Sequence, residues 1–374
     1  MKIVASILSL LVVSSSADDC LNVEVNFAFG GAMTGTTNRA LECLGGLIAD
    51  CNVLDQYKQN LDSVGLILPG VSQQVDFASQ SLTDVQSNKK KDMFTLLAGG
   101  NDFFGPYPIW DPAVDPPAYG EDFPDGFPPE FVPFTAKWSV ENLEYAMERI
   151  VELGGKLILM GSTLEPCSTL ICDVLQPPEF QIPVKLYSPV WSGQFDAGIQ
   201  EVVAKANDKY EDVTVIFVDV VSTVDALLAS GDFITDISCQ QDGGFSGPDE
   251  RGNYACPGYA WLDLTHPTSE FWEAVVDAAF IPALEAELSD KEIKDIRRII
   301  SFGDSYADFG SFEDTLDRAD SFELSGRFPP SNRRSAMNAA TYVEILEEKL
   351  SVSYPSVAYI QESGRDPICM KEQE

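Results

Sequence analysis

The chain has 374 residues, of which 59 are acidic and 24 are basic, so its formal net charge is −35 at pH 7. Apolar residues make up 45% of the sequence, which is enough for a large hydrophobic core and excludes a disordered chain. The charge argues against nucleic acids and anionic membrane surfaces as partners, because both attract proteins with a surplus of Lys and Arg.

The first 17 residues have the composition of a secretory signal peptide. Lys2 precedes an apolar run over residues 3–13, and small residues follow as far as Ala17. The run is too short to span a bilayer, and no other stretch reaches the ~20 apolar residues of a spanning helix, so we expect no transmembrane anchor. We therefore expect a secreted, extracellular protein whose mature part, residues 18–374, forms a single domain.

Eight cysteines can form up to four disulfide bonds in an oxidising compartment. Short spacings favour three local pairs, namely Cys43 with Cys51, Cys167 with Cys172, and Cys239 with Cys256. Cys20 and Cys369 remain, one near each end of the chain. They either join each other, stay free, or pair with Cys43 or Cys51, and the sequence leaves this open.

Short apolar runs alternate with amphipathic stretches of helical period along the mature chain. This alternation is typical of an α/β fold in which helices cover both faces of a mostly parallel sheet. The expected strands are residues 23–29, 93–98, 156–160, 213–219 and 297–302, and the expected helices are residues 139–153, 194–209, 268–287 and 335–350. Residues 103–134 break this rhythm with Pro, aromatic and acidic residues, so we expect a lid or cleft wall there; the alternative is a floppy insertion.

His266 is the only histidine of the chain. A single histidine excludes a poly-histidine metal site but leaves one general base. Asp263 lies three residues earlier, and a tight turn at that spacing can bring its carboxylate to Nδ1 of the imidazole. The alternative interpretation of this pair is a structural motif that caps the N-terminus of the following helix.

Ser305 is the candidate nucleophile. It follows Gly303 and Asp304 at the end of an expected strand, where side chains of α/β proteins project into the ligand-binding crevice. A helix that follows can also present backbone N–H groups to an oxyanion. The alternative interpretation is an ordinary Gly-Asp-Ser turn.

Two further segments carry groups that suit the binding of an oxyanion. Gly30 and Gly31 follow the first expected strand, and Asn101 follows the second. Glycine lets a backbone N–H approach a substrate oxygen closely, and the Asn amide adds a second donor; in acyl transfer each donor contributes ~2.7–4 kcal/mol. Each segment alone could be a turn, but all four candidate segments follow or adjoin one edge of the expected sheet.

These segments resemble the four sequence blocks of the GDSL or SGNH hydrolase superfamily of secreted esterases and lipases. The resemblance rests on IISFGDSYADFG with GRFPP downstream, NFAFGGAMTG, GGND and DLTHPT. It implies a three-layer α/β/α, flavodoxin-like SGNH hydrolase fold that needs no metal or organic cofactor. Position by position, it implies a catalytic triad of Ser305, His266 and Asp263 and an oxyanion hole of Ser305, Gly31 and Asn101.

The order of the blocks differs from that of the superfamily. Its members run Ser, Gly, Asn, Asp-His, whereas here the serine block comes last; read as a circle, the order is intact. We therefore expect a circular permutation whose new ends lie between the helix of the serine block and the strand of the glycine block. Cys20 and Cys369 would then lie close enough to join the two ends.

The resemblance implies a secreted serine esterase or lipase that cleaves carboxylic esters by two-step acyl transfer. Members of the superfamily act on acetylated carbohydrates, short fatty esters and phospholipids. We expect a small-molecule, lipid or carbohydrate ester as substrate and favour a general carboxylester hydrolase. The candidate from another class is a secreted binding protein that kept the fold and lost the activity. The oligomeric state is left open.

Overall fold

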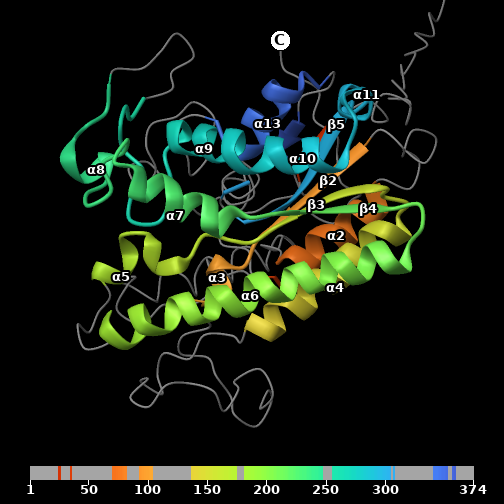
Figure 1. The fold of residues 1–374 in the computed structure, drawn as a ribbon, viewed down its shortest axis with the longest axis horizontal. Coiled ribbons are helices and arrows are strands. Elements are labelled where there is room, and N and C mark those ends of the chain that lie inside the picture. The colour runs from red at the N-terminus through yellow and green to blue at the C-terminus, as the bar shows by residue number, and fades with distance from the viewer. Residues whose placement is uncertain are drawn as a thin grey trace, which may run out of the picture.

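The computed structural model describes residues 24–26, 34–35, 70–81, 92–103, 136–174, 181–246, 255–304, 306–307, 340–352 and 356–358. These residues form three layers, a sheet between two layers of helices (Figure 1). This is the α/β/α architecture that the alternation of apolar runs and amphipathic stretches predicts.

The middle layer is a sheet of six strands in the order β4-β3-β2-β5-β1-β6, and every pair in it is parallel. The strands are β1 (Glu24–Asn26), β2 (Asp92–Leu97), β3 (Leu157–Gly161), β4 (Thr214–Val218), β5 (Arg298–Gly303) and β6 (Ser356–Ala358). The two central strands, β2 and β5, are buried along their whole length. Strands covered on both faces carry continuous apolar runs instead of an alternating pattern, as the sequence has them.

Helices cover both faces of the sheet (Figure 1). A separate hydrophobic core lies between the sheet and the helices on each face. One face is packed by α2 (Val71–Ser81), α4 (Ala136–Glu152) and α6 (Gln181–Lys209). The other is packed by α7 (Val220–Ser230), α9 (Ser269–Val275), η6 (Val276–Phe280), α10 (Ile281–Glu287) and α13 (Tyr342–Leu350). The shorter helices are α3 (Gly100–Phe103), η4 (Pro166–Ser168), α5 (Ile171–Val174), α8 (Cys239–Asp242) and α11 (Asp290–Lys294).

The strand order is that of a group of folds that bind ligands at a defined edge of the sheet. When β5 is counted as the first strand and β1 to β4 follow, the order across the sheet is 2-1-3-4-5, which is that of flavodoxin-like folds, and β6 is an added edge strand. In such folds the ligand lies outside the carboxyl ends of the strands, where the order reverses. Here that point lies between the carboxyl ends of β5 and β2.

The five expected strands are confirmed. Four of them lie within one residue of the expected limits at both ends, and of the first, expected over 23–29, the structure describes Glu24–Asn26. The sequence does not predict β6. The helix expected over 194–209 in fact begins at Gln181, so its predicted start is wrong. Pro189 lies inside it, and prolines normally end helices. The buried side chains of Val184, Tyr187 and Trp191 keep this helix continuous, because they anchor the turns on both sides of the proline.

The other three expected helices are present with changed limits. α4 begins three residues early, the helix over 268–287 consists of α9, η6 and α10, and α13 begins at Tyr342 behind the capping residue Thr341. Thr341 and Glu344 form a capping box that fixes this start.

Two expected disulfides are present, Cys167–Cys172 and Cys239–Cys256. The other four cysteines, the expected signal peptide over 1–17, and residues 104–134 of the expected lid lie outside the described residues. In the part of the chain that the structure describes, no helix combines the length and the apolar character needed to cross a membrane.

Candidate active site

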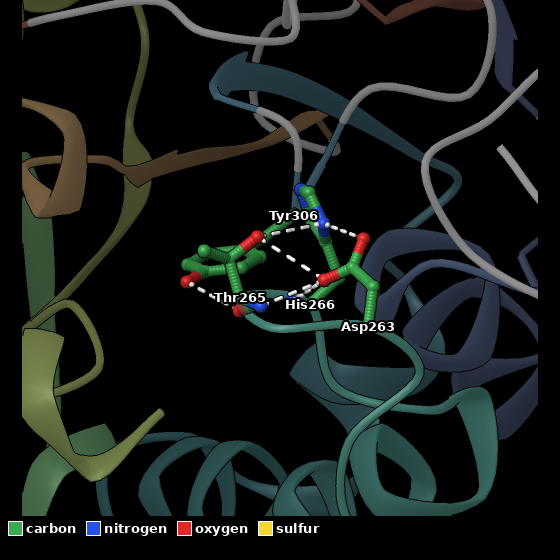
Figure 2. A network of polar contacts seen from close by, with 4 residues as sticks. All are labelled: Asp263, Thr265, His266 and Tyr306. Atoms are coloured by element: carbon green, nitrogen blue, oxygen red, sulfur yellow. Dashed lines mark hydrogen bonds and ion pairs between the residues drawn. The ribbon is translucent and has the colours of Figure 1, made fainter. Parts of the chain in front are cut away.

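Asp263 and His266 meet in a tight turn ahead of α9. Oδ2 of Asp263 lies 2.8 Å from Nδ1 of His266. Oδ1 accepts two backbone hydrogen bonds, from the N–H groups of Thr265 and His266, both at 2.7 Å (Figure 2). Both carboxylate oxygens are therefore engaged by the turn, and the contact expected from the spacing is present.

The helix cap belongs to another residue. Thr268 is the N-cap of α9, and its hydroxyl accepts the N–H of Phe271 at 3.1 Å. The same hydroxyl donates to the carbonyl of Tyr259 at 2.7 Å. The alternative interpretation of Asp263 and His266 as a capping motif is therefore wrong, and their side chains are directed at each other.

The electrostatics of the pair favour an ionised carboxylate beside a basic ring. Burial alone would raise the pKa of Asp263, but the charge and hydrogen bond of His266 and two backbone N–H groups bring it below its ordinary value. Burial would likewise lower the pKa of His266, but Asp263 outweighs this and raises it above 6.5. Because the carboxylate can only accept, Nδ1 carries the proton, and Nε2 of the neutral ring is the nitrogen that can accept one.

Tyr306 joins the serine block to this turn. Its hydroxyl donates to the carbonyl of Thr265 at 3.2 Å, and its ring stands edge-on to the imidazole of His266 with 5.9 Å between centroids (Figure 2). Its ring also packs against Trp272 of α9, with 5.7 Å between centroids. Ser305 itself lies outside the described residues, but the next residue in the chain is thus held against the histidine.

Asp304, which precedes Ser305, is a buried acid. Burial raises its pKa to about 7; the nearby charge of Asp102 acts in the same direction, while the N–H of Tyr306 and the charge of His266 act against it. Its Oδ1 accepts that N–H at 3.1 Å. The pKa places Asp304 between its neutral and charged forms near pH 7.

Asn101 lies in the first turn of α3, directly after β2. The next residue, Asp102, is fully buried and accepts the N–H of Thr34 at 3.0 Å and its hydroxyl at 2.6 Å. Burial raises the pKa of Asp102 to about 6 against the lowering effect of hydrogen bonds from Thr34 and Ser139. Gly31 lies outside the described residues, but Thr34, three positions later, is bonded to the neighbour of Asn101.

The structure therefore brings Asp263 to His266 and brings neighbours of the other predicted site residues, Ser305, Gly31 and Asn101, into contact with this end of the sheet. Sequence reasoning missed three polar residues there, Asp102, Asp304 and Tyr306. Each directly adjoins a predicted site residue, and that adjacency is the signal that could have found them. In the described part of the chain, no cluster of three or more His, Cys, Asp or Glu side chains could hold a metal ion.

A comparison with models of protein families finds a match. The family model of GDSL-like lipase/acylhydrolase matches residues 10–279. The matched range contains Gly31, Asn101, Asp263 and His266 and ends before Ser305. No curated protein matches the chain.

Proposed function

We propose that the chain, which belongs to the GDSL-like lipase/acylhydrolase family and is thus an ester-hydrolysing enzyme, cleaves carboxylic esters with a catalytic triad. In this triad Ser305 is the nucleophile, His266 is the base, and Asp263 is the carboxylate that orients the histidine. The observation that carries the proposal is the link from Asp263 through His266 to Tyr306, the residue after Ser305. It joins two segments that the sequence separates by about 40 residues.

The reaction proceeds in two steps through an acyl-enzyme. Nε2 of His266 takes the proton of the Ser305 hydroxyl as its oxygen attacks the ester carbonyl. The tetrahedral oxyanion is bound by the backbone N–H groups of Ser305 and Gly31 and by the side chain of Asn101. His266 then gives the proton to the departing alcohol, the carbonyl re-forms, and water repeats the sequence on the acyl-enzyme to release the acid.

Asp263 has two duties in this scheme. Its Oδ2 accepts Nδ1–H, which leaves Nε2 unprotonated in the resting enzyme. Its charge stabilises the imidazolium that forms during each step. The two backbone hydrogen bonds to Oδ1 keep the carboxylate in the orientation that both duties require.

The proposal includes a circular permutation of the family's block order. Two observations support it: the order 2-1-3-4-5 appears when β5 is taken as the first strand, and the family match ends at residue 279, ahead of the serine block. In addition, β1 and β6, the described strands closest to the two ends of the chain, are parallel neighbours in the sheet. Permutation is tolerated where the ends of a domain lie close together.

The proposed compartment is extracellular, on the grounds of the N-terminal sequence and of the two disulfides. The proposed substrates are uncharged small-molecule, lipid or carbohydrate esters. A net charge of −35 disfavours strongly anionic lipid surfaces at low ionic strength.

Hydrolysis of p-nitrophenyl acetate by the mature chain tests the proposal, with Ser305→Ala and His266→Ala as variants. Each should lose several orders of magnitude in kcat while keeping its melting temperature, because the triad acts as a unit. A Ser305→Ala variant that keeps more than about a tenth of the wild-type turnover contradicts the nucleophile, because that loss is far below the usual effect. A chain-length series of acyl esters beside an acetylated oligosaccharide then separates the substrate classes.

A further inference from the structure

Gln74 of α2 is bonded to the backbone at the very end of β5. Its Nε2 donates to the carbonyl of Gly303 at 2.8 Å, and the N–H of Gly303 donates to its Oε1 at 2.9 Å. Gly303 lies two residues beyond Ser301, at which β5 pairs with Asn26 of β1. The side-chain amide thus supplies the donor and acceptor that a neighbouring strand would supply, at a point only two residues before Ser305.

The same helix holds the segment that follows Gly31. The N–H of Ser72 donates to the carbonyl of Gly35 at 3.1 Å, and its hydroxyl donates to the carbonyl of Thr34 at 3.1 Å. Less than one turn of α2, from Ser72 to Gln74, therefore carries contacts to two separate blocks of the site. α2 is a short, rigid spacer between them.

A polar side chain is costly at the position of Gln74. The residue is fully buried, and Val71, Val75 and Ala78 around it on the helix belong to the hydrophobic core. Burying an amide is unfavourable unless its hydrogen bonds are satisfied, and an apolar side chain would fill this position without that cost. The two hydrogen bonds to Gly303 offset the free-energy cost of burying the Gln74 amide.

We propose that Gln74 is a positioning residue for the hydrolytic reaction, which holds the turn that carries Ser305 in register with the segment that carries Gly31. The inference rests on the proposed function. Nucleophile and oxyanion donor must reach the same carbonyl group, and a displacement of ~1 Å can cost ~100-fold in rate. Gln74 acts through Gly303 and does not touch substrate.

The experiment compares Gln74→Met and Gln74→Glu with the matched control Gln73→Glu. Methionine keeps the length of the side chain but makes neither bond to Gly303, whereas an ionised glutamate can still accept the N–H. Gln73 lies on the same helix, and its Oε1 contacts only the N–H of Gly70, at 3.3 Å, among the hydrogen bonds known for it. All chains are assayed on p-nitrophenyl acetate below their melting temperatures, and the rate at which a fluorophosphonate labels Ser305 is measured in parallel.

We expect kcat and the labelling rate to fall by about 10- to 100-fold in Gln74→Met, and by less in Gln74→Glu, with KM nearly unchanged. Gln73→Glu should keep both rates. If the Gln74 variants are folded and less stable but match the control in kcat and labelling, Gln74 is merely structural and the inference is overturned. If Gln74→Met does not fold, Gln74→Glu decides in the same way. If the wild-type chain itself neither hydrolyses the ester nor reacts with the fluorophosphonate, the proposed function fails, and the inference falls with it.

Discussion

The exchange Asp263→Asn tests the proposed triad most sharply, because the structure determines how the new side chain must lie. Oδ1 accepts the backbone N–H groups of Thr265 and His266, both at 2.7 Å. An amide nitrogen in that place would face two donors, so the asparagine has to keep its oxygen there. Its NH₂ group then occupies the place of Oδ2, 2.8 Å from Nδ1 of the histidine.

This orientation inverts the tautomer of His266. An NH₂ group can only donate, so Nδ1 becomes the acceptor and the proton moves to Nε2. Nε2 then cannot accept the proton of Ser305, and the charge that stabilises the imidazolium is lost as well. The same exchange in a serine-protease triad lowers kcat on the order of 10⁴-fold, which corresponds to about 5 kcal/mol of transition-state stabilisation, and we expect a loss of this size.

The assay is kcat on p-nitrophenyl acetate, with the melting temperature as a check of folding. Asp242→Asn is the matched control, since Asp242 also accepts a side-chain hydrogen bond, from the hydroxyl of Tyr259, but has no contact with His266 among those known for it. The control should keep wild-type turnover. A folded Asp263→Asn chain with more than about a tenth of the wild-type kcat would show that the carboxylate does not set the tautomer of a catalytic base.

Three further predictions concern pH and packing. The acid limb of kcat/KM should lie above pH 6.5, because Asp263 raises the pKa of His266; a profile that stays flat down to pH 5 contradicts His266 as base. Burial raises the pKa of Asp304 to about 7 and that of Asp102 to about 6, so the folded chain binds these two protons more tightly than the unfolded chain. The free energy of unfolding should therefore fall by a few kcal/mol as pH rises from about 4 to 7. Urea titrations across this range measure it, and Asp304→Asn should flatten the slope. Gly99→Ala should destabilise the fold, because the φ angle of Gly99 is +134° and a Cβ there would lie 2.8 Å from the ring of Phe195. Gly193→Ala, in open space on α6, should instead stabilise the fold by about 0.5–1 kcal/mol. Equal melting temperatures for the two variants would refute the packing explanation.

The strands and the local part of the site could be predicted from the sequence alone. The strands at 92–97 and 298–303 are buried on both faces. Each can therefore be recognised by its apolar composition alone, without knowledge of the strand that pairs with it. The contact between Asp263 and His266 is also local, since it spans three residues and one turn. Interactions of this kind are set by the chain itself, and tertiary packing only has to leave them in place.

The surroundings of Asp263 and His266 depend on tertiary packing and could not be predicted. α2 was not predicted, although Val71, Val75 and Ala78 lie at helical spacing. The hydrogen bonds of the polar Gln74 among them depend on β5, which lies beside α2 only in the folded chain. The bond between Gln74 and Gly303 spans 229 residues, and that between Thr34 and Asp102 spans 68.

The same holds for the pKa of Asp304 and for the place of Tyr306. Both residues adjoin Ser305 in the sequence, but the raised pKa of Asp304 comes from burial, and the contact of Tyr306 with Thr265 comes from the approach of a segment 41 residues away. Desolvation and long-range hydrogen bonds depend on which elements share an edge of the sheet. That arrangement follows from burying both apolar faces of the sheet at once, which no single segment of the sequence specifies.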